Sequence, residues 1–336
     1  MISKHLGRRS FVKLSAACAS LTSPLMGKTQ SMDANIKVAI DIATTEIRIG
    51  IIEKRHSVPL KLIGYKSIQN SGMKLGLIED TTTVSRNIVA CINLFEESLR
   101  SKITDVVAAL PGIKIAGKTN VAGFSQLATS LNLSKLNLQK VHLKNQMSGD
   151  AVLIDEEKKN GVLVIDLGAA TTSLAYFINN SLLNAQTIPI AGDMVTSDIA
   201  MALRTTKIAA EKIKVDFGNL SATNPSLDFE FEVPRLDGLP SRKLKAVAIP
   251  QIIEPRIIEI FELIKVSQKE INKAYGPIKS IVLTGGTSLT PTIAKICSDI
   301  CALKTRLGEH RIPIDKSIEI SGPRSSVLAG MLLSLS

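Results

Sequence analysis

Apolar residues in this chain gather in short continuous runs that are typical of buried β-strands. The first clear run begins at Ile36 and reads Ile-Lys-Val-Ala-Ile-Asp-Ile-Ala-Thr-Thr-Glu-Ile-Arg-Ile-Gly-Ile-Ile-Glu. Two apolar strands flank a tip that is rich in acidic and hydroxyl side chains. This pattern predicts a β-hairpin.

A second hairpin of the same design follows Gly161, with the sequence Val-Leu-Val-Ile-Asp-Leu-Gly-Ala-Ala-Thr-Thr-Ser-Leu-Ala-Tyr-Phe. The aspartates at the two tips, Asp41 and Asp166, lie 125 residues apart. The repetition indicates that the chain is duplicated.

A third element begins at Ile281 and reads Ile-Val-Leu-Thr-Gly-Gly-Thr-Ser-Leu-Thr-Pro. It predicts a buried strand, a turn at Gly285 and Gly286, and a helix that opens near Pro291. The paired glycines allow the backbone to pass close to a flat ligand such as adenosine.

The composition agrees with an α/β protein of two folding units. The chain has 336 residues, of which 45% are apolar and only 3% aromatic, with no tryptophan. The core must therefore consist of Ile, Leu, Val and Ala, which suits helices packed on buried strands.

The formal charge of +11 changes this picture little. Five basic residues and no acidic residue lie in the first 31 residues, which leaves a net charge of +6 on the rest of the chain. No basic stripe with interleaved aromatic residues is present, so we expect an ordinary basic surface and no nucleic-acid partner. The four cysteines, Cys18, Cys91, Cys297 and Cys301, have no Cys-x-x-Cys spacing, which favours a reduced, cytosolic setting and core positions.

The amino-terminal segment, residues 1–31, has three interpretations. Arg8 and Arg9 followed by the apolar stretch from Leu14 to Met26 are similar to a twin-arginine export signal, but no small-x-small cleavage site follows. In the second interpretation, which we favour, the segment is an upstream extension of a protein that starts at Met32. In the third, it is a basic apolar segment that touches a membrane. No run reaches the ~18 apolar residues of a spanning helix.

The tips of both hairpins suit phosphate binding. Small residues let backbone N–H groups approach phosphate oxygens, and threonines add hydroxyl donors. The residues concerned are Ala43, Thr44 and Thr45 in the first tip and Gly168, Ala169, Ala170, Thr171 and Thr172 in the second. Asp41 and Asp166, facing each other across a cleft, could hold Mg²⁺ through its water molecules.

These three elements, in this order, resemble the phosphate 1, phosphate 2 and adenosine motifs of the superfamily of actin, sugar kinases and DnaK. Within it the chain is most similar to the FtsA family, on Ile188-Pro-Ile-Ala-Gly-Asp-Met-Val-Thr-Ser-Asp-Ile-Ala, Ala210-Glu-Lys-Ile-Lys-Val-Asp-Phe-Gly and Ile252-Ile-Glu-Pro-Arg. The resemblance implies a duplicated actin-like, ribonuclease H-like ATPase fold with two halves around a cleft for ATP and Mg²⁺.

The resemblance also implies the residues of the cleft. The phosphates and metal would meet Asp41, Ala43, Thr44 and Thr45 from one side and Asp166, Gly168, Ala169 and Thr171 from the other, with Gly192 and Asp193 lining the cleft. Glu211 and Lys214 would flank ribose and adenine, and Gly285, Gly286 and Thr287 would form the adenosine turn. By spacing alone, a solvated helical pair is the favoured interpretation of Glu211 and Lys214, and Pro255 with Arg256 could be only a helix start.

The chain departs from the family pattern in three places. Ala43, Ala169 and Ala170 stand where the family usually has glycine, and any of them that needed positive φ would cost about 1 to 2 kcal/mol. Only about 50 residues separate Pro111 from Gly161, so subdomain 1C of the family looks largely deleted, with residues 132–143 as a remnant helix and strand. No basic amphipathic tail follows the closing helix, which puts attachment to the membrane in doubt.

We therefore expect an amino-terminal extension (1–31), a first half (32–160) whose hinge helix spans residues 148–153, a second half (161–325) and a closing hinge helix (326–336).

The resemblance implies a cytoplasmic ATP-binding scaffold at the division site, on the inner face of the membrane, at most a slow ATPase. It would bind the tubulin-like protein FtsZ and other division proteins, and self-association is possible. Arg242, Lys243 and Arg256 would contact an acidic peptide of the partner. The alternatives are a small-molecule kinase, a pilus-assembly scaffold, or a decayed copy without nucleotide.

Overall fold

In the computed structural model, the chain is described over residues 35–54, 61–111, 114–115, 118–119, 121–220, 228–310 and 322–335. The amino-terminal segment, with the twin-arginine pattern, Cys18 and Met32, lies outside these residues. The described chain forms one compact unit from Asn35 onward.

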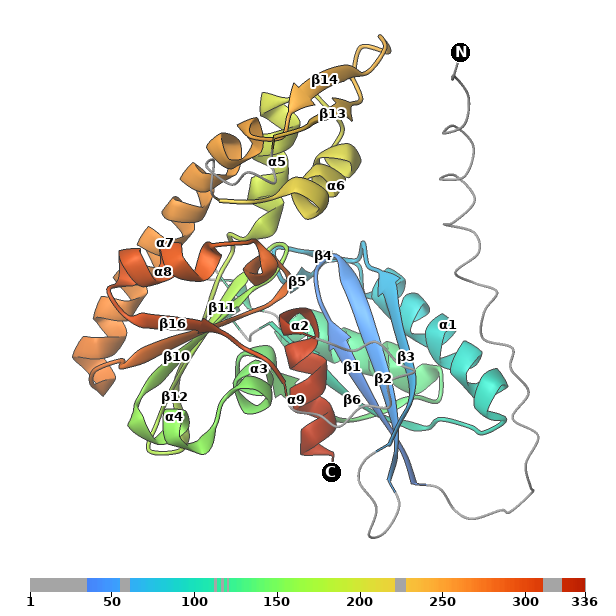
Figure 1. Cartoon of the computed structure of the whole chain (residues 1–336). Coiled ribbons are helices and arrows are strands. Elements are labelled where there is room, and N and C mark those ends of the chain that lie inside the picture. Colours follow the sequence, from blue (N-terminus) through green and yellow to red (C-terminus); the bar gives the residue numbers. More distant parts are fainter. Residues whose placement is uncertain are drawn as a thin grey trace. The chain divides into compact units, whose positions relative to one another are not determined.

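Figure 1 shows the two large sheets of the described chain. Each has five strands, and the two sheets share one strand order. The first has the order β3 (Lys61–Gln69), β2 (Glu46–Lys54), β1 (Asn35–Ile42), β6 (Asp105–Leu110) and β9 (Asn137–Leu143). The second has the order β12 (Ser181–Ile188), β11 (Thr172–Ile178), β10 (Val162–Leu167), β15 (Ser280–Thr284) and β16 (Lys304–Leu307). In both, three antiparallel strands precede two parallel ones. The predicted hairpins are β1–β2 and β10–β11, which confirms the duplicated α/β fold.

Helices cover the outer face of each sheet and close two separate cores. On the first sheet these are α1 (Thr81–Leu99) and α2 (Val121–Leu133). On the second they are α5 (Gly192–Ala202), α7 (Ala248–Tyr275) and α8 (Ile293–Cys301), which buries Cys297 and Cys301. Helix α1 begins where the sequence provides a cap, because the Asp80 carboxylate accepts a hydrogen bond from the Thr83 amide.

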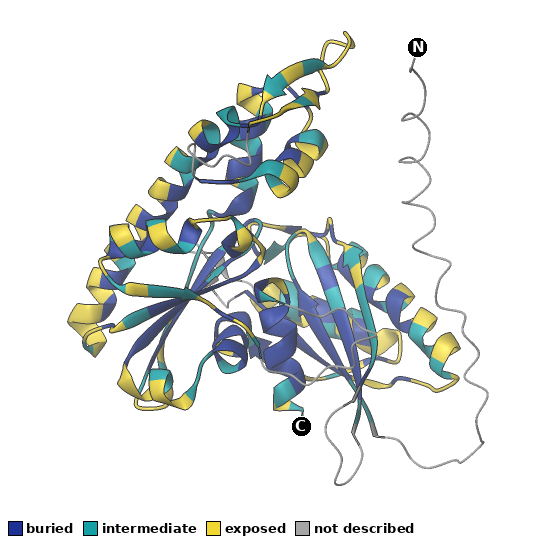
Figure 2. Ribbon diagram, viewed as in Figure 1, coloured by how far each residue is buried: buried dark blue, intermediate teal, exposed yellow. Residues whose placement is uncertain are grey.

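Two helices, α3 (Lys144–Val152) and α9 (Ser326–Ser334), pack between the inner faces of the two sheets. Both are nearly all buried (Figure 2). Gly330 of α9 lies directly on the backbone of Met147 in α3, and only a residue without a side chain permits such an approach. The hinge helix that the sequence placed at residues 148–153 begins four residues earlier, because the chain turns into it directly from β9.

The second half carries a small extension made of α6 (Lys207–Phe217) and the hairpin of β13 (Glu230–Val233) and β14 (Arg242–Lys245). Phe217 packs against the rings of Phe229 and Phe231, which joins the helix to the hairpin. Pro255 does not mark a helix start, since α7 begins at Ala248; the proline lies inside that helix, where it removes one backbone hydrogen bond.

The remaining elements are short and connect the larger ones. Two-stranded hairpins are formed by β4 (Met73–Lys74) with β5 (Leu77–Ile78) and by β7 (Lys114–Ile115) with β8 (Lys118–Thr119), and helix α4 spans Asp155–Asn160. The 3₁₀ turns η3 (Gly286–Leu289) and η4 (Pro323–Ser325) complete the set. The predicted remnant of residues 132–143 is the end of α2 followed by β9, which belongs to the main sheet. Within the described residues, no helix is both long and apolar enough to span a bilayer.

Candidate functional site

A pocket of about 520 Å³ lies between the tips of the two predicted hairpins. Its volume falls in the range of ordinary small-molecule sites. Thirteen of the fifteen residues predicted for the cleft line it, namely Asp41, Ala43, Thr44, Thr45, Asp166, Gly168, Ala169, Thr171, Glu211, Lys214, Gly285, Gly286 and Thr287. The three motifs, far apart in the sequence, therefore meet in one place.

Gly192 and Asp193 differ from the prediction, because neither lines the pocket. They lie behind its wall: the Gly192 amide donates to the Gly168 carbonyl over 3.2 Å, and the Asp193 amide donates to the Ala169 carbonyl over 2.7 Å. Their backbone supports the second tip and contributes no surface to the pocket.

Each tip is a tight turn closed by one backbone hydrogen bond. The Ala43 amide donates to Glu46 in the first turn, and the Gly168 amide donates to Thr171 in the second, at 3.0 and 3.1 Å. Within the described part of the chain, the amides inside the turns, such as those of Thr44 and Ala169, have no hydrogen-bond partner. Such turns offer backbone N–H groups to an anion.

The alanines that replace glycine cause no backbone strain. None of Ala43, Ala169 and Ala170 is among the residues with positive φ. The cost of about 1 to 2 kcal/mol that a left-handed alanine would carry therefore does not arise. What remains is one methyl group at each position.

The glycine turn after β15 does require its glycine. Gly285 has a φ of +86°, and its amide donates to the Pro323 carbonyl over 3.0 Å. The Thr287 hydroxyl donates to the Gly168 carbonyl over 2.7 Å, which fixes this turn against the turn of the second hairpin. One side of the pocket is thus a rigid backbone surface.

Glu211 and Lys214 of α6 form the predicted pair on one helical face, with 2.7 Å between the ammonium and the carboxylate. The ammonium also donates to the Thr196 hydroxyl over 2.8 Å and to the Gly192 carbonyl over 3.2 Å. Since both residues line the pocket, the pair is more than a solvated surface contact.

Asp41 is paired with two cations, neither of which the sequence singled out. The Arg48 guanidinium lies 2.8 Å from its Oδ2, and the Lys144 ammonium forms an ion pair with its Oδ1 at 2.5 Å. The side chains of Asp41, Arg48 and Lys144 are only 1%, 11% and 9% exposed. Burial opposes ionisation, but the two cations outweigh it and hold the pKa of Asp41 below its ordinary value.

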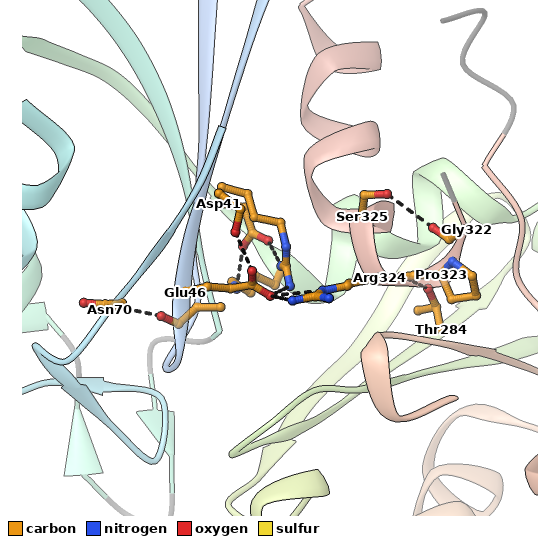
Figure 3. A network of polar contacts seen from close by, with 12 residues as sticks. Asp41, Glu46, Asn70, Thr284, Gly322, Pro323, Arg324 and Ser325 are labelled. Carbon is orange, nitrogen blue, oxygen red and sulfur yellow. Dashed lines mark hydrogen bonds and ion pairs between the residues drawn. The ribbon is translucent and has the colours of Figure 1, made fainter. Parts of the chain in front are cut away.

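The charged chain continues from Arg48 to the other side of the pocket. Arg48 also pairs with Glu46, which accepts hydrogen bonds from Arg324 over 2.9 and 3.2 Å and from Ser67 over 2.5 Å. Figure 3 shows Arg324, from the turn before α9, reaching toward Glu46 on β2. Positive and negative groups thus alternate from Lys144 to Arg324.

Asp166 has a different environment from Asp41. It makes no ion pair within the described residues, and burial raises its pKa to about 6. Lys144 and Arg48 act against this rise, and the Asp41 carboxylate adds to it. The two aspartates of the duplicated motif are therefore not equivalent in charge environment.

The predicted pair of metal ligands fits Mg²⁺ poorly at Asp41. A magnesium ion needs carboxylate oxygens that are not already engaged by cations, because it competes with them for the same charge. Both oxygens of Asp41 are in contact with cations.

The residues that sequence reasoning missed are Arg48, Lys144, Glu46 and Arg324, all of which line the pocket. Arg48 had a signal: it interrupts an apolar strand and lies directly opposite Asp41 in the hairpin register. Lys144 and Arg324 had none, because their positions depend on how α3 and η4 pack.

The residues predicted to contact a partner lie outside the pocket. They differ in whether their side chains already have partners within the chain. Arg256 forms ion pairs with Asp198, at 2.7 Å, and with Glu259. Arg242 donates to the Leu203 carbonyl over 2.7 Å. Lys243, which follows Arg242 in β14 of the hairpin extension, is exposed.

The family model for cell division protein FtsA matches residues 163–330, which is half of the chain. The chain belongs to the FtsA family. Among curated FtsA proteins, that of Pseudomonas aeruginosa is 33% identical over 205 residues, and that of Neisseria meningitidis is 34% identical over 201. Each alignment covers 59% of this chain but only 49% or 48% of the relative. The chain thus spans about half the length of the FtsA proteins it matches.

Solved structures show that this FtsA-family chain has an actin-like fold. MreB5 of Spiroplasma citri bound to ADP superposes with a TM-score of 0.67 at 18% identity, over 89% of this chain and 95% of that one. A PilM–PilN type IV pilus biogenesis complex gives 0.66 at 16% identity, over 89% and 98%. The predicted fold class and family resemblance are confirmed.

Proposed function

We propose that this FtsA-family protein is an actin-like scaffold of bacterial cell division that binds ATP in the pocket between its halves. The carrying observation is the pair of facing hairpin turns, whose inner amides have no partner within the described chain. Backbone amides and hydroxyls in such turns suit phosphate oxygens. That MreB5, with the same fold, was solved with ADP supports a nucleotide as the ligand.

The adenosine would lie against the Gly285–Gly286 turn. A β-carbon at Gly286 would meet no atom nearer than 3.9 Å, so the space in front of this turn is open. Glu211 and Lys214 stand at the edge of the same pocket, where a ribose and a base would find a carboxylate and an ammonium. Magnesium at Asp41 and Asp166 stays a prediction, and the cations on Asp41 argue against it.

Full-length protein titrated with a fluorescent ATP analogue should bind it with micromolar affinity, and unlabelled ATP should compete. GTP and AMP serve as further competitors: GTP tests the preference for the base, and AMP tests the contribution of the β- and γ-phosphates. If no nucleotide competes at millimolar concentration, the pocket does not bind nucleotide, and the decayed-copy alternative replaces this proposal.

We further propose FtsZ as the partner and the division site, on the cytoplasmic face of the membrane, as the location. The hairpin extension of β13 and β14 offers exposed Lys243, whereas Arg242 and Arg256 are engaged within the chain. Lys243 is therefore the cation of this group that is best placed for an acidic peptide. Self-association is compatible with the fold but has no surface assigned to it.

Lys243→Glu should weaken binding of a carboxyl-terminal FtsZ peptide about tenfold, which is a change of about 1.4 kcal/mol, because a like charge replaces an attractive one. The measurement is fluorescence anisotropy of the labelled peptide. Lys140→Glu, an exposed substitution on β9, is the matched control and should leave the affinity unchanged. Equal loss in both variants would reduce the effect to net charge, and no loss in either would remove Lys243 from the interface.

A further inference from the structure

We infer that the Lys144 ammonium takes the place of a divalent cation in this pocket, so that the protein binds nucleotide without Mg²⁺. The inference rests on the proposed nucleotide function and specifies its cofactor requirement. It is carried by the ion pairs of Asp41, the aspartate that the duplicated motif presents to the pocket.

Each oxygen of the Asp41 carboxylate is already in contact with a cation, which opposes the approach of a metal ion. Arg48 occupies Oδ2 at 2.8 Å, and Lys144 occupies Oδ1 at 2.5 Å. All three side chains are nearly inaccessible to solvent. To bind Mg²⁺ there, the protein would have to break a buried ion pair, which is unfavourable because a buried charge is left without a partner.

The position of Lys144 follows from the fold. Strands β1, β6 and β9 run parallel, with Asp41 opposite Ala109 and Ala109 opposite His142, so their carboxyl ends meet at one edge. Lys144 is the first residue of α3, directly after β9, and therefore stands at the edge where Asp41 lies, one residue before the end of β1.

The next residue holds the start of α3 in place. The Asn145 side-chain amide donates to the carbonyls of Leu174 and Gln186, in the second sheet, over 3.0 and 2.9 Å. One pair of neighbouring residues thus contacts both halves: Lys144 reaches Asp41 in the first, and Asn145 reaches β11 and β12 in the second. The Lys144 side chain is therefore buried at a helix start that is fixed by hydrogen bonds, unlike a flexible lysine at the surface.

The charges around Asp41 suit a nucleotide that arrives without a metal. From Lys144 through Asp41, Arg48 and Glu46 to Arg324, three cations alternate with two anions, which leaves one positive charge beside the first hairpin turn. Asp166, Glu211 and Lys214 line the rest of the pocket. Metal-free nucleotide carries more negative charge than its magnesium complex, and buried cations with amide donors compensate it. The charge of Lys144 also opposes the rise in the pKa of Asp166, although the ammonium pairs with Asp41.

The test compares nucleotide affinity of the full-length protein in Mg²⁺ and in EDTA, by calorimetry with ATP. The wild-type protein should bind in both, with dissociation constants that agree within about threefold. In Lys144→Met, Oδ1 of Asp41 is released, so binding should become Mg²⁺-dependent, with EDTA weakening it at least about tenfold. Lys144→Arg should keep the wild-type behaviour, and Lys212→Met, an exposed lysine of α6, is the matched control.

The outcomes separate the inference from the function. Wild-type binding that is lost in EDTA overturns the inference but leaves the nucleotide site standing. An absence of binding in both conditions overturns the proposed function and the inference with it. If Lys144→Met does not fold, as judged by its melting curve, the wild-type comparison and Lys144→Arg still decide the matter.

Discussion

A Gly330→Ala variant is expected to unfold more easily than the wild type by about 3 kcal/mol or more, because its methyl group has no space. An added β-carbon would overlap the carbonyl oxygen of Met147 and lie 2.6 Å from its carbonyl carbon. Those atoms belong to the backbone of α3, so no side-chain rotation can relieve the clash. Helices α3 and α9, which connect the two sheets, would have to move apart.

The sign of the change makes this prediction decisive. Helix propensity alone would make Gly330→Ala stabilising by about 1 kcal/mol, since alanine is the better helix former. Ser334→Ala, in the same helix but exposed, should change the free energy of unfolding by less than about 1 kcal/mol. Chemical denaturation of both variants measures the difference, and a Gly330→Ala protein as stable as the wild type would mean that α3 and α9 do not pack this closely.

Gly285→Ala should remove most nucleotide binding while the rest of the chain stays folded. The residue has a φ of +86°, where alanine costs about 1 to 2 kcal/mol. Its β-carbon would also overlap Oδ1 of Asp166 and lie 2.5 Å from the Leu167 carbonyl oxygen. The turn must therefore shift at the point where the adenosine and second phosphate motifs meet, and we expect ATP affinity to fall at least about tenfold.

Gly286→Ala is the matched control for the effect of Gly285→Ala on stability. Its β-carbon would lie 3.9 Å from the nearest atom, Cγ of Arg324, and its φ is not left-handed. Its melting temperature should stay close to that of the wild type, whereas that of Gly285→Ala should fall. If calorimetry gives Gly285→Ala wild-type affinity for ATP, the glycine turn is no part of the nucleotide site.

The sequence by itself determined the repeated architecture and most of the pocket. Each of the three motifs is a local pattern, in which an apolar strand ends in a turn of small and hydroxyl residues. Strand and turn are decided by neighbouring residues, so the patterns could be interpreted without knowing the fold. Since duplicated hairpins occupy the same place in two equivalent sheets, their tips could also be expected to face one another.

Only the tertiary structure decided the charges within that pocket. Asp41 and Lys144 lie in different elements, and Glu46 and Arg324 are 278 residues apart in the chain. Such contacts depend on the order of the strands and on how α3 and η4 pack, which no local pattern reports. The sequence therefore located the turns that line the pocket, and the fold decided which cations surround them.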